Sequence, residues 1–210
     1  MVTPMTSVRF FDWFVLGALA CLLGLGIARA GVLYARGVSV VVIDWQRTPR
    51  EQLVDLLLVV VFLAWFYETV AYAWPLHSHV IPARLAVVVV ESSLVKVVGM
   101  LAIWAGLLIF ALALWAFADS WRIGIDRHTP GALTTHGIFA WTRNPIYIAL
   151  DLMVFGTFLV LGRVIFLALV IALTGLLHAE IRREENYLAR TYGSAYREYC
   201  ARVGRYVRWR

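Results

Sequence analysis

Apolar residues dominate five stretches of the chain, and polar or charged residues cluster between them. The stretches cover about residues 10–34, 53–75, 94–118, 145–161 and 163–178. Because a transmembrane helix needs roughly 20 mostly apolar residues, this pattern predicts about five membrane-spanning helices. The last two stretches are short and meet near Gly162, which predicts a helical hairpin. The expected fold class is an all-α integral membrane protein with a cytoplasmic amphipathic tail.

Composition leads to the same class. The 210 residues are 62% hydrophobic and the mean hydropathy is +0.79, which is too apolar for one soluble core. The first apolar stretch runs on past Cys21 without a small-residue cleavage site, so we expect a true span rather than a cleaved signal peptide. Cys21 and Cys200 lie far apart in sequence, and the pattern predicts neither a disulfide framework nor a metal site.

The charge distribution predicts an orientation in the membrane. The chain has 19 basic and 13 acidic residues, and most arginines fall on one side of the predicted spans. The other side carries Arg9, Arg84, Lys96 and Arg163. By the positive-inside rule the arginine-rich side, with the C-terminus, is cytoplasmic, and no nucleic-acid partner is expected. Lys96 is the only lysine, which favours a GC-rich bacterial source and hence the bacterial inner (cytoplasmic) membrane.

Several segments outside the main pattern raise their own hypotheses. Residues 38–43 are apolar but too short to cross, so they indicate a re-entrant or interfacial piece. His77 and His79 stand between two prolines, and two ligands without a third are a weak metal signal. Glu68 lies deep in the second span, where an ionisable residue serves a function or pairs with a neighbouring helix.

Polar residues gather where the fourth apolar stretch begins, in "WTRNPIYIALDLMVFG". Asn144 before Pro145 is typical of a helix start, with the Asn side chain expected to cap the free amides. Tyr147 and Asp151 are four residues apart and therefore share a helix face. With Arg143 beside them, they indicate a wet, occupied cavity at the membrane edge.

The end of the fifth stretch carries a matching set of charges. Glu180, Glu184 and Tyr187 fall on one face with Arg183 beside them, and Glu185 lies on the adjoining face. A hairpin at Gly162 gathers at one rim Arg143, Asn144, Tyr147, Glu180, Glu184 and Glu185. Such a cluster suits a zwitterionic ligand with a cationic centre. The alternative is a collar of solvated ion pairs at the membrane interface.

Two segments carry a family resemblance. "THGIFAWTRNPIYIALDLMVFGTFLV" and "EENYLARTYGSAYREYCARVGRY" resemble the C-terminal half of the isoprenylcysteine carboxyl methyltransferases and the related phospholipid methyltransferases. The resemblance covers roughly residues 121–207 and divides the chain into N-terminal transmembrane helices, 1–120, and a catalytic half, 121–210. Departures from the family pattern are Ile138 and Phe139 for Pro-Tyr, Asn144 for His and Ala149 for Gly.

The resemblance implies a methyltransferase that uses S-adenosylmethionine and acts on a lipophilic acceptor. The acceptor classes are an isoprenylcysteine-like carboxylate, a lipid, or a small thiol or amine, with membrane lipids as further partners. Carried over by position, the cofactor-binding residues are His136, Gly137, Arg143, Asn144, Tyr147, Glu184 and Glu185. The expected catalytic residues are Arg143, Arg183 and Glu184. Asn144 cannot act as a base at neutral pH, so a mechanism that needs the family His is not expected here.

Two other functions stay open at this point. Membrane sterol reductases, which use NADPH, resemble the same C-terminal hairpin. A non-catalytic scaffold or small transporter would instead use Glu68 and Asp151 along a transport path, although the chain shows no internal repeat. The tail after Leu188 alternates arginines with aromatics and predicts either a surface anchor or a lid over the pocket.

Overall fold

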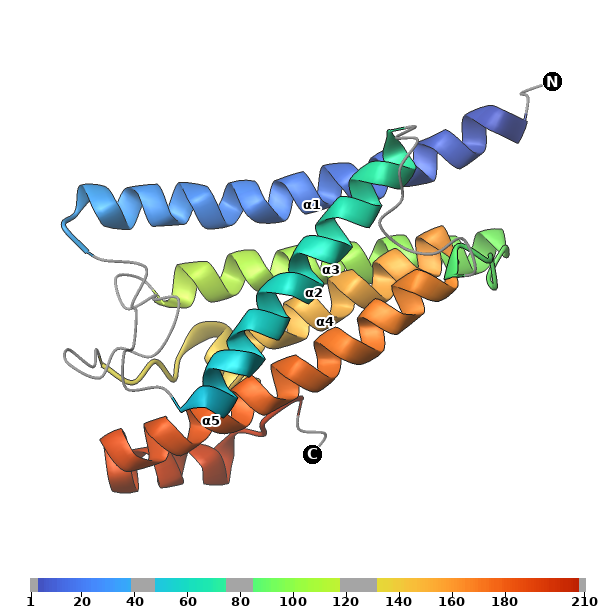
Figure 1. Ribbon diagram of the computed structural model, residues 1–210. Helices are drawn as coiled ribbons and strands as arrows, with labels where there is room; N and C mark the ends of the chain where they lie inside the picture. Colours follow the sequence, from blue (N-terminus) through green and yellow to red (C-terminus); the bar gives the residue numbers. More distant parts are fainter. Residues whose placement is uncertain (1–3, 39–47, 75–84, 118–131, 208–210) are drawn as a thin grey trace.

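The fold consists of long helices laid side by side (Figure 1). The computed structural model describes residues 4–38, 48–74, 85–117 and 132–207. Its elements are α1 (Pro4–Ala35), α2 (Pro49–Ala73), α3 (Ser93–Phe117), the 3-10 helix η3 (Gly137–Ala140), α4 (Pro145–Leu161) and α5 (Val164–Arg202). Four of the helices are long and apolar enough to cross a membrane, and α4 is a shorter apolar helix. The predicted all-α membrane fold is confirmed, since the described part of the chain contains no strand.

Glycines allow α3 and α4 to pack backbone against backbone. A Cβ at Gly156 would lie 2.7 Å from the Gly99 carbonyl oxygen, and one at Gly106 would lie 2.8 Å from the Ala149 carbonyl oxygen. Close approach through small residues is the usual way in which membrane helices associate. Ala149, which stands where the family has Gly, is fully buried in this contact. The packing fixes α4, and therefore its polar N-terminal end, against α3.

The hairpin between α4 and α5 forms at Gly162, as the sequence predicts. Gly162 caps α4 with φ +66, and a Cβ there would collide with the Val90 carbonyl oxygen. The segment before α3 holds the turn, because the Val89 amide donates to the Gly162 carbonyl (2.7 Å) and the Val164 amide donates to the Val87 carbonyl (3.0 Å). The turn sends α5 back along α4, so the charged end of α5 returns beside the start of α4.

Helix α5 continues well past the predicted span and includes most of the predicted tail. The backbone leaves helical geometry at Gly193 (φ 55, ψ −118), and Figure 1 shows the chain doubling back there. The returning part buries Tyr196, Tyr199 and Val203 against Leu188 and its neighbours. The apolar face of the tail therefore packs on the protein itself, as a lid would, rather than lying free as a surface anchor.

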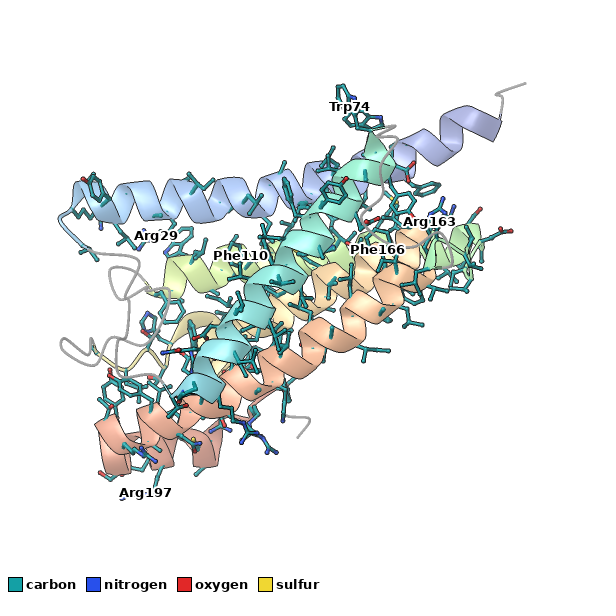
Figure 2. All side chains as sticks on the ribbon, viewed as in Figure 1. Arg29, Trp74, Phe110, Arg163, Phe166 and Arg197 are labelled. Carbon is teal, nitrogen blue, oxygen red and sulfur yellow. The ribbon has the colours of Figure 1, made fainter. Side chains whose placement is uncertain are left out.

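Arg163 and Arg197, one from each predicted group of basic residues, lie at opposite ends of the bundle. Arg163 marks the hairpin end and Arg197 the far end of α5 (Figure 2). At the hairpin end the Arg163 guanidinium stacks over the Tyr72 ring at 4.4 Å. In α2, Glu68 is 1% exposed, and its functional role stays a prediction. Two hypotheses concern parts of the chain outside the described residues. They are the re-entrant piece, of which residues 39–43 lie outside, and the histidine pair His77 and His79.

Candidate active site at the polar end of the α4–α5 hairpin

The site begins at the N-terminus of α4. Pro145 occupies the first helical turn, as expected, but the expected Asn144 cap is wrong, because this side chain makes no capping hydrogen bond. Its amide nitrogen instead donates to Glu185 Oε1 (3.3 Å) and to the Arg205 carbonyl (3.1 Å). The side-chain amide of Asn144 therefore bonds to these two acceptors and does not cap the helix. Thr142 Oγ1 accepts the hydrogen bond of the Asn144 backbone amide (3.2 Å) in place of a cap.

Glu185 is the centre of the network. Its Oε1 faces Arg143 Nη2 at 3.1 Å, and its Oε2 accepts from Arg205 Nε at 2.8 Å and faces Arg205 Nη2 at 2.6 Å. Glu185 is only 8% exposed and Asn144 only 5%. A buried carboxylate needs partners of opposite charge, because an unpaired one costs several kcal/mol, on the order of 3–5. Two guanidinium groups supply that pairing here.

Arg143 connects this network to the returning tail. Its guanidinium lies over the Tyr196 ring at 5.9 Å and also contacts the Cys200 sulfur. Its Nε is buried and makes no hydrogen bond within the described part of the chain. The Tyr199 hydroxyl donates to the Phe139 carbonyl at 2.7 Å and so joins the tail to η3. Arg143 therefore retains an unused, buried donor beside an acidic partner.

Tyr147 and Glu184 form a second pair one turn further along. The Tyr147 hydroxyl donates to Glu184 Oε2 at 2.8 Å. The pair joins α4 to α5 directly, and it confirms that the hairpin brings these two residues together. A carboxylate oriented by a phenol is a suitable holder for a cationic group.

Arg183 points to a different neighbour. Its guanidinium bridges Asp55 Oδ1 of α2 (3.0 Å) and Glu180 Oε1 (2.5 Å). Arg183 Nε and Glu180 Oε2 are buried and make no hydrogen bond among the described residues. Arg183 thus ties α5 to α2, and its charge is already shared between two carboxylates.

His136 and Gly137 lie at the edge of the site. Both are exposed at the start of η3, and the His136 side chain makes no capping hydrogen bond. Gly137 has φ +61, and a Cβ there would press on Ala116 at 3.2 Å. Within the described residues, no hydrogen bond joins His136 to the carboxylates, so its role in binding stays a prediction.

Asp151 lies one turn beyond Tyr147 and pairs with α5. Its Oδ1 accepts the Thr174 hydroxyl at 2.8 Å. A short distance along α5, His178 Nδ1 lies 2.6 Å from the Tyr206 hydroxyl. The predicted shared face of Tyr147 and Asp151 therefore meets α5 at two separate polar pairs, and the transport role considered for Asp151 stays a prediction.

A groove opens between the N-terminal end of α2 and α5. It has a volume of about 610 Å³. Its lining consists of Thr48, Arg50, Glu51, Val54, Gly175, His178, Ala179, Glu180, Arg182, Arg183 and Asn186. The lining combines charged side chains with the apolar Val54 and Ala179, as an amphiphilic ligand requires. The Arg183–Glu180 pair forms one wall, so the groove adjoins the carboxylate cluster.

Several residues of the site were not predicted from the sequence. Asp55 was detectable, because it is a carboxylate within the apolar run "LVDLLLVVV" and such residues pair or act. Arg205, Cys200 and Thr142 had no such signal, since their roles depend on the reversal of the chain after Gly193.

A comparison with protein families matches the segment that contains these residues. Residues 94–195 match the family model of the phospholipid methyltransferases. That family is part of the isoprenylcysteine and phospholipid methyltransferase superfamily. A search of curated proteins gave no match.

The match extends from the start of α3 to residue 195 within α5, so it begins before the segment expected from the sequence. It includes Arg143, Asn144, Tyr147, Glu184 and Glu185. The match supports a membrane methyltransferase in general and does not favour the reductase alternative. Methyltransferases of this family typically use S-adenosylmethionine. The carboxylates Glu180, Glu184 and Glu185 thus lie within the matched segment.

Proposed function

We propose that the chain is an S-adenosylmethionine-dependent methyltransferase, with the polar end of the cofactor held at the start of α4 and the facing part of α5. The observation that carries this proposal is the convergence of Arg143 and Tyr147 with Glu184 and Glu185 inside the segment matched by the family. A cation and two carboxylates side by side suit a ligand that carries both an ammonium and a carboxylate.

The residues present fit such a cofactor. The buried Arg143 Nε has no hydrogen-bond partner among the described residues, and a ligand carboxylate would satisfy it. Glu184, oriented by Tyr147, is available for a cationic group, and Glu185 adds a second carboxylate beside it. Asn144 contributes a neutral amide where the family has His, so it can hold and orient a ligand but cannot accept a proton at neutral pH.

Methyl transfer requires mainly that the chain align the cofactor with the acceptor and exclude water from the site. The bound cofactor supplies an electrophilic methyl group, which a lone pair of the acceptor displaces from sulfur. Arg143 and Asn144 fix one end of the site, and Glu184 fixes the other. The tail residues Tyr196 and Tyr199 cover the network and exclude water. A carboxylate or thiolate acceptor needs no base, which agrees with the absence of one at Asn144.

The acceptor in this proposal is lipophilic and enters through the α2–α5 groove. Exposed Arg50 and Arg182 at the groove would attract an anionic head group, while Val54, Gly175 and Ala179 accommodate an apolar part. Arg183 is a positioning residue, because Asp55 and Glu180 already share its charge. In this proposal Arg183 does not take the direct catalytic role that we expected from the sequence.

The same proposal places the site on the cytoplasmic side of a bacterial inner membrane. The arginine-rich end of the bundle is the end that carries the carboxylate cluster, and positive residues favour the cytoplasmic side. A reporter enzyme that works only in the cytoplasm should therefore be active when it is fused after Arg210. A reporter that works only in the periplasm should be inactive at the same position. Activity of a periplasmic reporter would contradict this orientation.

Calorimetric titration of the detergent-purified protein with S-adenosylmethionine, and in parallel with NADPH, tests the function. We expect saturable S-adenosylmethionine binding that weakens roughly tenfold or more in Glu184→Gln and in Tyr147→Phe, because each loses a hydrogen bond to a charged group. Arg197→Ala, an exposed change at the far end of α5, should bind normally. NADPH binding alone would favour the reductase, and binding of neither would favour the scaffold or transporter.

A further inference from the structure

The last described residues form a strap across the site. We define the strap as Val203–Tyr206. The Gly204 carbonyl accepts the Arg143 backbone amide at 3.1 Å, and the Arg205 carbonyl accepts both Thr142 Oγ1 (3.1 Å) and the Asn144 side chain (3.1 Å). These bonds attach the strap to the segment that leads into α4.

Both ends of the strap are anchored. Val203 is buried with Tyr196 and Tyr199 at its near end. At its far end Tyr206 stacks on His178, with ring centroids 6.2 Å apart, and its hydroxyl lies 2.6 Å from His178 Nδ1. Burial raises the pKa of the Tyr206 phenol, so the phenol stays protonated at neutral pH, and the tautomer of His178 sets which group donates. The strap is therefore closed at both ends around Glu185.

Within the strap, Arg205 occupies one side of the Glu185 carboxylate. It contacts Oε2 through both Nε and Nη2, at 2.8 and 2.6 Å. Oε1 is already engaged by Arg143 and Asn144. A carboxylate offers about four acceptor positions, and here these contacts fill all of them. An incoming ammonium group must displace one of these partners before it can pair with Glu185.

Arg205 is the partner that can leave at the lowest cost. Its side chain is 35% exposed, against 13% for Arg143, so water can replace its contacts. Arg143 is held further by Tyr196 and Cys200, and it would become an unpaired buried charge. Arg205, by contrast, lies in a short segment after the end of α5 and moves with only the strap.

We propose that Arg205 competes with the cofactor, because it occupies the position on Glu185 that the cofactor's ammonium group would take. The strap therefore releases when the cofactor binds. This inference rests on the proposed function and adds a regulatory step to the same site. The apparent affinity for the cofactor equals the affinity of the open form multiplied by the fraction of molecules that are open, so a closed strap lowers it. Salt, which screens the partly exposed Arg205–Glu185 pair, should shift molecules toward the open form.

Titration with S-adenosylhomocysteine at low salt tests the competition without turnover. We expect Arg205→Gln to bind roughly threefold tighter or more than the unaltered chain, because the open fraction rises. Arg205→Lys keeps the charge and should lie between the two, which separates competition from a folding defect. Arg197→Ala removes an exposed positive charge of the same tail and should match the unaltered chain. Weaker binding by Arg205→Gln would overturn the strap inference.

Hydrogen exchange at the Arg143 amide reports the strap itself, because that amide donates to the Gly204 carbonyl. We expect S-adenosylhomocysteine to accelerate this exchange, and Arg205→Gln to accelerate it without ligand. Slower exchange on binding would show a lid that closes on its ligand and would overturn the inference while leaving the proposed function intact. Failure of both the unaltered chain and Arg205→Gln to bind would overturn the proposed function, and the named ligand with it.

Discussion

At the scale of single residues, Asn144 shows how a departure from the family pattern is used. Its amide donates to Glu185 and to the Arg205 carbonyl, so it acts as a buried donor between two acceptors. The family His in this place would offer one N–H donor when neutral and two when protonated, with a titratable charge. An amide instead keeps the position neutral at all working pH values. The substitution therefore favours binding and orientation over proton transfer.

Replacing Asn144 by Asp tests this reading. The new side chain has nearly the same shape, but it presents acceptors to two acceptors in a position that is 5% exposed. We expect a loss of about 1–3 kcal/mol of stability at neutral pH, the cost of an unsatisfied buried polar group. Thermal unfolding in detergent should recover at low pH, where a protonated Asp donates again. Equal melting temperatures of Asn144→Asp and the unaltered chain at neutral pH would contradict the donor role.

At the scale of elements, the α3–α4 contact positions the site. The backbones of Gly99 and Gly156 approach so closely that a Cβ on either would lie within 3 Å of the other's carbonyl oxygen. Helix α4 therefore cannot shift against α3 without losing this packing. Because Pro145 starts the same helix, the contact also fixes Arg143 and Tyr147.

Gly156→Ala should lower the melting temperature in detergent, because the new methyl group forces two backbones apart and overpacking costs about 1–3 kcal/mol. The matched control is Gly24→Ala in α1, where a Cβ meets nothing within 4 Å. We expect that control to be neutral or slightly stabilising, since Ala is the better helix former by about 0.5–1 kcal/mol. A similar loss in both variants would show that packing at Gly156 is not the cause.

The Arg183 bridge makes a separate prediction at this scale, because it joins α2 to α5 through partly buried charges. Asp55→Asn and Arg183→Gln should each destabilise the fold. The double variant should cost less than the sum of the two, with a coupling of roughly 1 kcal/mol or more. Chemical or thermal unfolding of the four proteins measures it. Additive effects would show that the bridge contributes no energy of its own.

At the scale of the whole molecule, the hydrophobic pattern predicted the helices because each span must satisfy its backbone internally and present apolar side chains to lipid. The hairpin at Gly162 was also predictable, and it determined the meeting of Tyr147 with Glu184. The strap was not, because the reversal at Gly193 depends on one backbone conformation and not on periodicity. Arg205 therefore joined the site only in three dimensions, whereas Asp55 was detectable in the sequence as a carboxylate within an apolar run.

The groove between α2 and α5 gives the prediction that decides how an acceptor reaches this site. A Cβ at Gly175 meets nothing within 4 Å, and Gly175 lines the groove, so the side chain of Gly175→Phe can start without a clash and place its ring in the groove. We expect S-adenosylmethionine affinity to stay unchanged, because Glu184 and Glu185 are untouched. The kcat/KM for a lipophilic acceptor, once a screen has found one, should fall roughly tenfold or more, since the ring occupies the path. Gly24→Phe in α1 is the matched control, with equal added bulk away from the groove. Unchanged kcat/KM in Gly175→Phe would place the acceptor path elsewhere, while a loss of cofactor binding would mean that the groove and the cofactor site are one cavity.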